Sequence, residues 1–93
     1  MSNDAQVLIR AAREVHVERH GAQTFVPGTR LPFLEAAKRT GIRPERQRYR
    51  EAIDDLEYEC AIEWDTSARY ARGDKHYLIT RRGLDGVLGR GKG

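Results

Sequence analysis

The 93-residue sequence has a single cysteine, Cys60, and no hydrophobic run that approaches the roughly 20 residues of a membrane-spanning helix. One cysteine cannot form an internal disulfide, which excludes a disulfide-stapled scaffold and favours a reducing compartment. The N-terminus also lacks the apolar core of a signal peptide. We therefore expect a cytoplasmic protein with no membrane partner.

Sequence patterns that carry catalysis or cofactor binding are also absent. There is no glycine loop that would cradle phosphates, no nucleophile placed beside a base and no zinc-ligand spacing. His16 and His20 lie four residues apart and would share a helix face, as metal ligands can, but no third ligand accompanies them. Glu51, Asp54 and Asp55 have no histidine or lysine placed to join them. We expect no metal, no cofactor and no enzymatic activity.

The chain is rich in charge, with 17 Lys and Arg residues, 14 Asp and Glu residues and a net charge of +3. An excess this small does not identify a partner, so the position of the charges matters more than their sum. Between positions 40 and 59 the bases come first and the acids follow: Arg43, Arg46, Arg48 and Arg50, then Asp54, Asp55, Glu57 and Glu59. Within one helix this order is unfavourable for the macrodipole and costs roughly 0.3–1 kcal/mol of helix stability per charge. A functional role of the arginines would explain why the order is kept.

Apolar periodicity, caps and turn residues predict one small α+β domain over 1–88 and a flexible Gly-rich tail over 89–93. The expected elements, in order, are a helix over 2–21, a short β-prone segment over 23–28, helices over 31–41 and 44–59, β-prone runs over 60–65 and 75–80 joined by a hairpin loop, and a closing helix capped by Thr80. A chain this short has no room for a second core.

The expected core positions follow from helical spacing and strand alternation. They are Val7, Leu8, Ala11, Ala12 and Val15 in the first helix, Phe33, Leu34, Ala36 and Ala37 in the second, Tyr49, Ile53, Leu56 and Cys60 in the third, and Ile62 with Trp64 on one face of a strand.

The order of these elements resembles the winged helix-turn-helix fold over nearly the whole chain. An aromatic-x-Ile-Thr-x-x-Gly run, formed by Tyr77, Ile79, Thr80 and Gly83, is similar to the end of the wing and the start of the closing helix in MarR- and PadR-like repressors. The resemblance implies a three-helix core with a helix-turn-helix, a short first strand, a two-stranded β-hairpin wing and a short closing helix. Those repressors dimerise through long terminal helices, which the Gly-rich tail does not provide, so a homodimer and a monomer are both open.

In such a fold the third helix places its N-terminal residues in the major groove of double-stranded DNA. The DNA-contacting positions that this implies are Arg43, Arg46, Gln47, Arg48, Arg50 and Glu51. Gln47 suits adenine, Arg48 suits guanine and Glu51 suits cytosine, whereas Arg43 and Arg50 suit phosphates. Arg46 is expected either at a phosphate or in an ion pair with Glu35 or Glu45.

The hairpin loop over 66–75 would be the wing. Arg69, Tyr70 and Arg72 at its tip would enter the minor groove, where narrow A·T tracts attract arginine, and Lys75 would contact a phosphate. An ordinary polar loop is the alternative. The resemblance thus implies a transcriptional regulator that reads the major groove with the helix over 44–59 and the backbone or minor groove with the wing.

A protein-protein interaction module on the same scaffold is the competing hypothesis. The segment 51–65 carries seven carboxylates, which would dock on a basic partner without any contact with DNA. A surface of solvated ion pairs, each contributing only ~0–1 kcal/mol, is a third interpretation of the charges. A DNA binder needs one continuous basic face across the third helix and the wing, whereas an interaction module lets the acids interrupt it.

Overall fold

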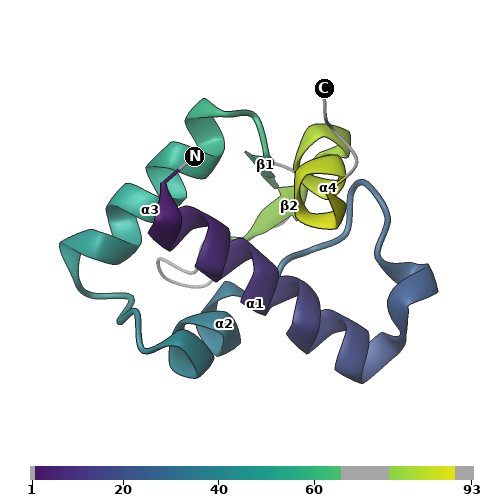
Figure 1. Ribbon diagram of the computed structural model, residues 1–93, viewed down its shortest axis with the longest axis horizontal. Coiled ribbons are helices and arrows are strands. Elements are labelled where there is room, and N and C mark those ends of the chain that lie inside the picture. The colour runs from purple at the N-terminus through teal and green to yellow at the C-terminus, as the bar shows by residue number, and fades with distance from the viewer. Residues whose placement is uncertain (1, 66–75, 90–93) are drawn as a thin grey trace.

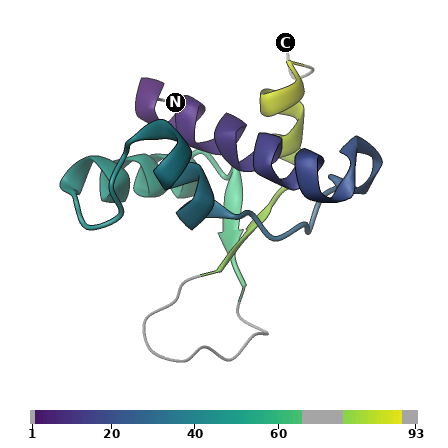
Figure 2. The ribbon, with the colours of Figure 1, turned by 90° about the horizontal axis from the view of Figure 1, so that it is seen from below.

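The computed structural model describes residues 2–65 and 76–89. Its helices are α1 (Asn3–His20), α2 (Phe33–Thr40), α3 (Gln47–Tyr58) and α4 (Arg81–Leu88), and a 3-10 turn, η1 (Ala22–Thr24), follows α1. The strands β1 (Ile62–Trp64) and β2 (Tyr77–Ile79) form an antiparallel sheet. Figure 1 shows α1 crossing the domain beside α2 and α3, and Figure 2 shows the two strands projecting from the layer of helices. The predicted α+β class is confirmed.

None of the helices in these two ranges is both long and apolar enough to cross a bilayer.

The ends of α1 lie where local chemistry predicts them. The Ser2 hydroxyl oxygen accepts a hydrogen bond from the Ala5 amide, and the Gly21 amide donates to a carbonyl of the last turn. The buried positions are Ala5, Leu8, Ile9, Ala11, Ala12 and Val15. Val7, which we expected in the core, is 39% exposed. The buried face is centred on Leu8 and Ala12, so it includes Ile9 and leaves Val7 outside.

The segment between α1 and α2 differs from the prediction. Residues 23–28 do not form a strand, because Ala22–Thr24 is a 3-10 turn closed by the Thr24 hydroxyl. The extended part comes later, over 28–31, where three backbone hydrogen bonds of 2.8–2.9 Å join the chain to β2 and Arg30 forms an antiparallel bridge. Pro27 has no amide hydrogen to donate, so pairing begins only after it.

The helix α2 ends at Gly41, which has the expected left-handed conformation (φ +78°).

The helix α3 begins at Gln47 and not at Pro44, so the predicted boundary is wrong. The Arg46 amide donates to the Arg43 carbonyl over 3.0 Å, which closes a turn with Pro44 in its second position. Proline suits that position as well as it suits a first helical turn, and the sequence alone does not separate the two.

The helix α3 buries one side against the core. Ala52, Ile53 and Leu56 are buried and Tyr49 is half-buried. Cys60, which we placed at the end of this stripe, is exposed, so that prediction is wrong. The helix ends at Tyr58, and the left-handed backbone of Cys60 (φ +61°) turns its side chain away from the helical face.

The sheet pairs Ile62 with Ile79 and Trp64 with Tyr77. Ile62 is buried as expected, but Trp64 remains 39% exposed. Its ring packs edge-on against Tyr77, with the ring centroids 5.6 Å apart. The pair therefore extends the core to the surface beside α3.

The junction between β2 and α4 is fixed by Thr80 and Gly83. The Thr80 hydroxyl accepts from the Gly83 amide at 3.0 Å and lies 2.5 Å from the Cys60 carbonyl, to which it donates. This confirms the predicted helix cap. Gly83 is buried, and a Cβ on it would lie 2.0 Å from the Ala61 carbonyl oxygen. Because that oxygen belongs to the backbone, only glycine fits here.

We predict that Gly83→Ala lowers the free energy of unfolding by about 1–3 kcal/mol or more, the usual cost of forcing an extra carbon into a packed site. The matched control is Gly86→Ala in the same helix, where a Cβ meets nothing within 4 Å. The control should raise stability by roughly 0.5–1 kcal/mol, because alanine is the better helix former. Urea denaturation followed by circular dichroism measures both, and equal effects of the two substitutions would contradict the close contact at Gly83.

Candidate nucleic-acid interface

The start of α3 carries two arginines that remain unneutralised. Arg46 is the N-cap residue, in an extended conformation, and its side chain makes no capping hydrogen bond. Arg50 lies one turn later and is exposed. Within residues 2–65 and 76–89, neither guanidinium forms an ion pair or a side-chain hydrogen bond. Positive charge therefore adds to the exposed amides of the first helical turn, which favour anions.

The ion pairs that we expected for Arg46 are formed by other arginines. Glu35 lies 3.5 Å from Arg19, and Glu45 lies 3.0 Å from Arg43. A hydrogen bond from its own amide, together with the Arg43 guanidinium, holds the pKa of Glu45 below its usual range. Arg43 thus sits before the helix in an ion pair, whereas Arg46 forms no ion pair within the described residues and acts on Glu45 only through its charge, which also lowers the pKa of Glu45.

Arg48 points toward α1 and not toward the open side of α3. Its guanidinium binds the Asp4 carboxylate with two hydrogen bonds of 3.0 and 3.1 Å. This pair raises the pKa of Arg48 and lowers the pKa of Asp4. Beside it the Ser2 amide donates to Asp55, whose pKa is lowered by that hydrogen bond. The charges on this side of α3 therefore join it to the start of α1.

On the outward side, Gln47 and Glu51 are linked to each other. The Gln47 side-chain amide donates to the Glu51 carboxylate over 2.8 Å. Both residues are exposed, as predicted for base-contacting positions. This hydrogen bond uses the amide group with which Gln47 would donate to adenine. Contact with a base therefore requires the Gln47 and Glu51 side chains to separate.

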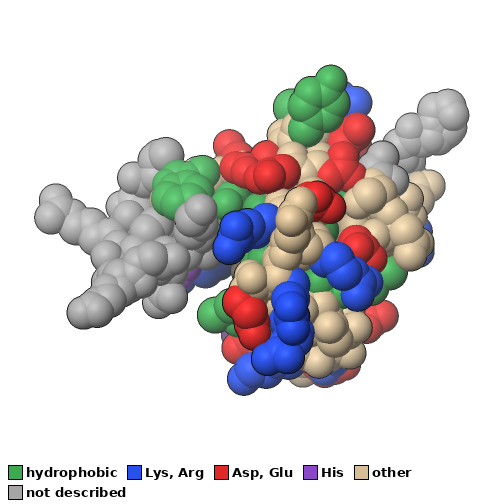
Figure 3. All heavy atoms as spheres, turned by 90° about the vertical axis from the view of Figure 1, so that its left-hand side faces the viewer, with side chains coloured by type: hydrophobic (Ala, Val, Ile, Leu, Met, Phe, Trp, Pro, Cys, Tyr) green, Lys and Arg blue, Asp and Glu red, His purple; other side chains and the backbone are tan. Residues whose placement is uncertain are grey.

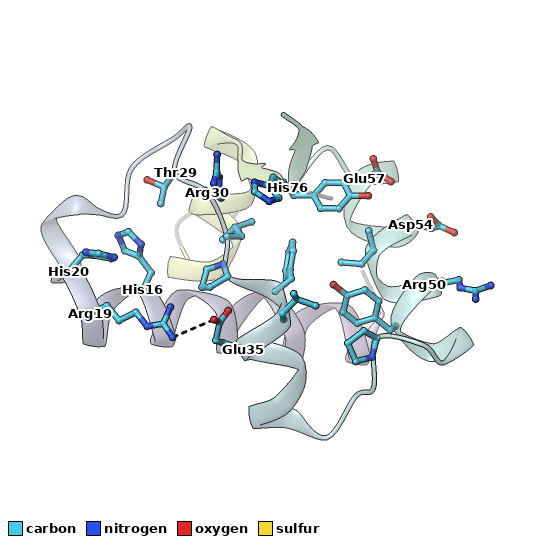
Figure 4. A pocket seen from close by; sticks show the side chains of 18 residues that line it. His16, Arg19, His20, Thr29, Arg30, Glu35, Arg50, Asp54, Glu57 and His76 are labelled. Carbon is cyan, nitrogen blue, oxygen red and sulfur yellow. Dashed lines mark ion pairs between the residues drawn. The ribbon is translucent and has the colours of Figure 1, made fainter. Parts of the chain in front are cut away.

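A groove of about 800 Å³ runs between the start of α2, the side of α3 and β2. Figure 4 shows Arg50, Asp54 and Glu57 of α3 at one end of it, and residues from the end of α1 at the other. Leu34, which we expected in the core, lines the groove and is 56% exposed. Acidic residues therefore share this face of α3 with Arg50, and the face is not continuously basic.

The far end of the groove holds His16 and His20, whose rings lie 4.8 Å apart. Burial and the neighbouring His20 lower the pKa of His16, and His16 Nε2 lies 2.7 Å from the Thr24 hydroxyl. The part of the chain that the structure describes contains no group of three His, Cys, Asp or Glu side chains that would hold a metal ion.

The proposed wing residues Arg69, Tyr70, Arg72 and Lys75 lie outside the described residues. The chain enters and leaves that segment through Asp65 and His76, where the Asp65 amide donates to the His76 carbonyl over 3.0 Å. Asp65 itself is buried, and one of its oxygens lies 3.7 Å from Arg30. It therefore does not belong to an exposed acidic surface over 51–65, although we counted it there.

Comparisons of the chain with protein-family models, with curated proteins and with solved structures find no match. Its function is therefore inferred from its own side chains and their arrangement.

Sequence reasoning found the charges at α3 but missed two of their relationships. The Arg48–Asp4 pair joins residues 44 positions apart, and no local pattern signals it. The proximity of the acids to the sheet was also missed. Burial, then the carboxylate of Glu57, the phenol of Tyr49 and the carboxylate of Asp54, raise the pKa of Tyr77 to about 12.

We predict that Tyr77 makes stability fall in strongly alkaline solution. The pKa of Tyr77 rises from 10.0 to about 12 on folding. The contribution of the neutral phenol to the free energy of unfolding is therefore fully present below pH 10.0 and is lost as the pH rises through about 12. Tyr77→Phe should flatten the pH dependence of the unfolding free energy in that window. The near-ultraviolet difference titration between the two proteins should show one tyrosinate with a midpoint near 12, and a midpoint near 10 would contradict the burial of Tyr77.

Proposed function

We propose that this chain is a small winged-helix protein that binds double-stranded DNA and regulates transcription. The fold assignment is supported by the order α1, extended segment, α2, α3, β1, β2, and by the pairing of residues 28–31 with β2. The Thr80 cap and the buried Gly83 give a physical reason for the Thr-x-x-Gly part of the resemblance. In this assignment α2 and α3 form the helix-turn-helix.

The observation that carries the proposal is the pair of unneutralised arginines, Arg46 and Arg50, at the start of α3. A recognition helix meets DNA with its N-terminal end, where phosphates and guanine edges accept from arginine. Carboxylates are present on the same helix, yet neither arginine pairs with one. Their charge is therefore available to an anion such as the DNA backbone.

The geometry changes the roles that we expect of individual residues. Arg48 is held by Asp4 on the side of α1, so it positions α3 and does not read a base in this arrangement. The proposal moves the direct contact to Arg50, with Arg46 and Arg43 at phosphates. Gln47 and Glu51 contact bases only after their mutual hydrogen bond opens. The wing contacts of Arg69 and Arg72 stay as proposed from the sequence.

A protein-interaction module remains the second candidate because of one specific observation. Asp54 and Glu57 are exposed, have no ion-pair partner in the described ranges and lie at the same groove as Arg50. These two carboxylates interrupt the basic face and would repel the phosphates of DNA. In this candidate a cationic protein segment docks on the acidic half of α3, and DNA affinity is absent even at low salt.

Fluorescence anisotropy of a labelled random duplex, titrated at several salt concentrations, tests the proposal. We predict micromolar binding with a log–log salt slope near about −4, which corresponds to roughly four or five neutralised phosphates. Arg50→Ala should reduce the magnitude of that slope by about 1 if Arg50 contacts a phosphate, or cost about 1–3 kcal/mol at a selected site if it contacts a base.

The control for Arg50→Ala is Arg10→Ala, which removes the same charge from the exposed side of α1, opposite its buried face. It should leave the slope and the affinity close to those of the parent. If both variants lost the same affinity for DNA, the loss would be explained by the change in net charge and not by a contact of Arg50. Absence of binding by the parent at low salt would overturn the DNA proposal and favour the interaction module.

A further inference from the structure

The flank of α3 that borders the groove carries charges of both signs in a fixed order. Arg46 and Arg50 stand at its start, and Asp54 and Glu57 stand at its end. All four side chains are exposed and form no ion pair within residues 2–65 and 76–89. Figure 3 shows this side of the molecule, where red side chains gather in the upper part and most blue side chains lie below them.

Helix geometry explains why these charges do not pair with one another along α3. Arg50 and Asp54 are four residues apart, and the order of base before acid is the weaker orientation for an ion pair along a helix. Of the neighbouring charges, Arg48 binds Asp4, Asp55 accepts from the Ser2 amide, and Glu51 accepts from the neutral side-chain amide of Gln47 and keeps its charge. Arg46, Arg50, Asp54 and Glu57, which we call the stripe, are the charged side chains of this helix that form neither an ion pair nor a side-chain hydrogen bond within the described residues.

The stripe also carries a large aromatic surface. Tyr58 ends α3 and is 85% exposed, the highest fraction among the exposed large hydrophobic residues of the described ranges. It lies eight residues after Arg50 and about 80° round the helix from it, so it borders the stripe at its C-terminal end. A partner that covers this stripe therefore gains apolar burial in addition to ion pairs, and a tyrosine ring also accepts a guanidinium on its face.

A second copy of this chain has the complementary order of charges when it approaches antiparallel. Arg50 and Asp54 are ~6 Å apart along the helix axis, and a two-fold axis passing between them places Arg50 of each copy opposite Asp54 of the other. The same axis places Arg46 of each copy opposite Glu57 and Tyr58 of the other. The contact is self-complementary, so both copies use the same four charges, two of each sign.

We propose that two copies of this protein associate through the groove-side flank of α3, with Arg46 and Arg50 of each copy paired with Asp54 and Glu57 of the other. The contact is electrostatic at its rim and covers Tyr58. Screening shortens the reach of such charges from about 10 Å at 0.1 M salt to about 3 Å at 1 M, so the association weakens as salt rises.

One consequence rests on the proposed function. The association occupies the arginines that DNA would need, so a molecule paired through α3 does not bind DNA through the same arginines. DNA and the second copy compete, and the free protein holds its own basic residues covered until DNA displaces the partner. The association itself is independent of DNA and is tested without it.

Analytical ultracentrifugation of three proteins tests the association. The parent should change with concentration from the mass of one chain, 10.6 kDa, toward twice that mass at low salt, and return to one chain in 1 M salt. An acidic variant, Arg46→Glu with Arg50→Glu, and a basic variant, Asp54→Arg with Glu57→Arg, should each remain single chains. An equimolar mixture of the two variants should regain the double mass, because the exchanged charges are again complementary.

Circular dichroism of both variants controls for folding, since all four positions are exposed and their substitution should leave the helical content unchanged. Tyr58→Ala should weaken the association of the parent without altering its salt dependence. A parent that keeps the mass of one chain at every concentration overturns the proposal. So does a pair of variants that self-associate as the parent does, or whose mixture contains only single chains. The basic variant stays a single chain and keeps Arg46 and Arg50, so its failure to bind DNA would refute the proposed function alone.

Discussion

The domain depends on the close approach of α1 to the helices beside it. Buried alanines make this approach possible, at Ala5, Ala11 and Ala12 of α1 and at Ala36, Ala37 and Ala52 of α2 and α3. Side chains no larger than a methyl group allow helices to approach closely, toward the short end of the usual separation of about 8–10 Å. Leu8 and Ile9 fill the remaining space. Because α1 contacts α2, α3 and α4, the position of one helix sets the positions of the other three.

That constraint extends to the candidate interface. The Asp4–Arg48 pair joins the first turn of α1 to the first turn of α3, so the direction in which α3 presents its arginines follows from the placement of α1. On the other side, residues 28–31 connect α1 to β2 before α2 begins. The groove beside α3 is bounded by α2 and by β2, and the placement of both walls follows from α1 and residues 28–31, which precede α2 in the chain.

The parts of the fold that the sequence predicted correctly depend on local chemistry. Ser2 and Thr80 cap helices with their own hydroxyl groups, and Gly41 ends α2 because it adopts a left-handed conformation without strain. The errors arose where a local signal has two meanings. Pro44 suits both a turn and a helix start, and Cys60 fits the helical spacing only if the helix continues beyond Tyr58.

The candidate site was predictable in its composition but not in its partners. The sequence showed that arginines precede acids around α3, and this order holds in the structure. It did not show that Arg48 would be bound by Asp4 while Arg50, two positions later, would form no ion pair with any residue that the structure describes. This difference depends on the side of α3 that faces α1, and tertiary packing determines that side. Asp65 illustrates the same limit, since burial removed it from an otherwise exposed acidic segment.

Cys60 is the single thiol of the chain, it is exposed, and it follows the end of α3 directly. Its carbonyl is held by the Thr80 hydroxyl, and its backbone conformation is fixed by the junction with α4. The protein therefore carries a built-in attachment point for a fluorophore or spin label, and no engineered cysteine is needed. A label attached to Cys60 is fixed to a backbone that hydrogen bonds hold in place. Its fluorescence or spin-label signal therefore reports the position of the acidic end of α3 and the approach of other molecules to it.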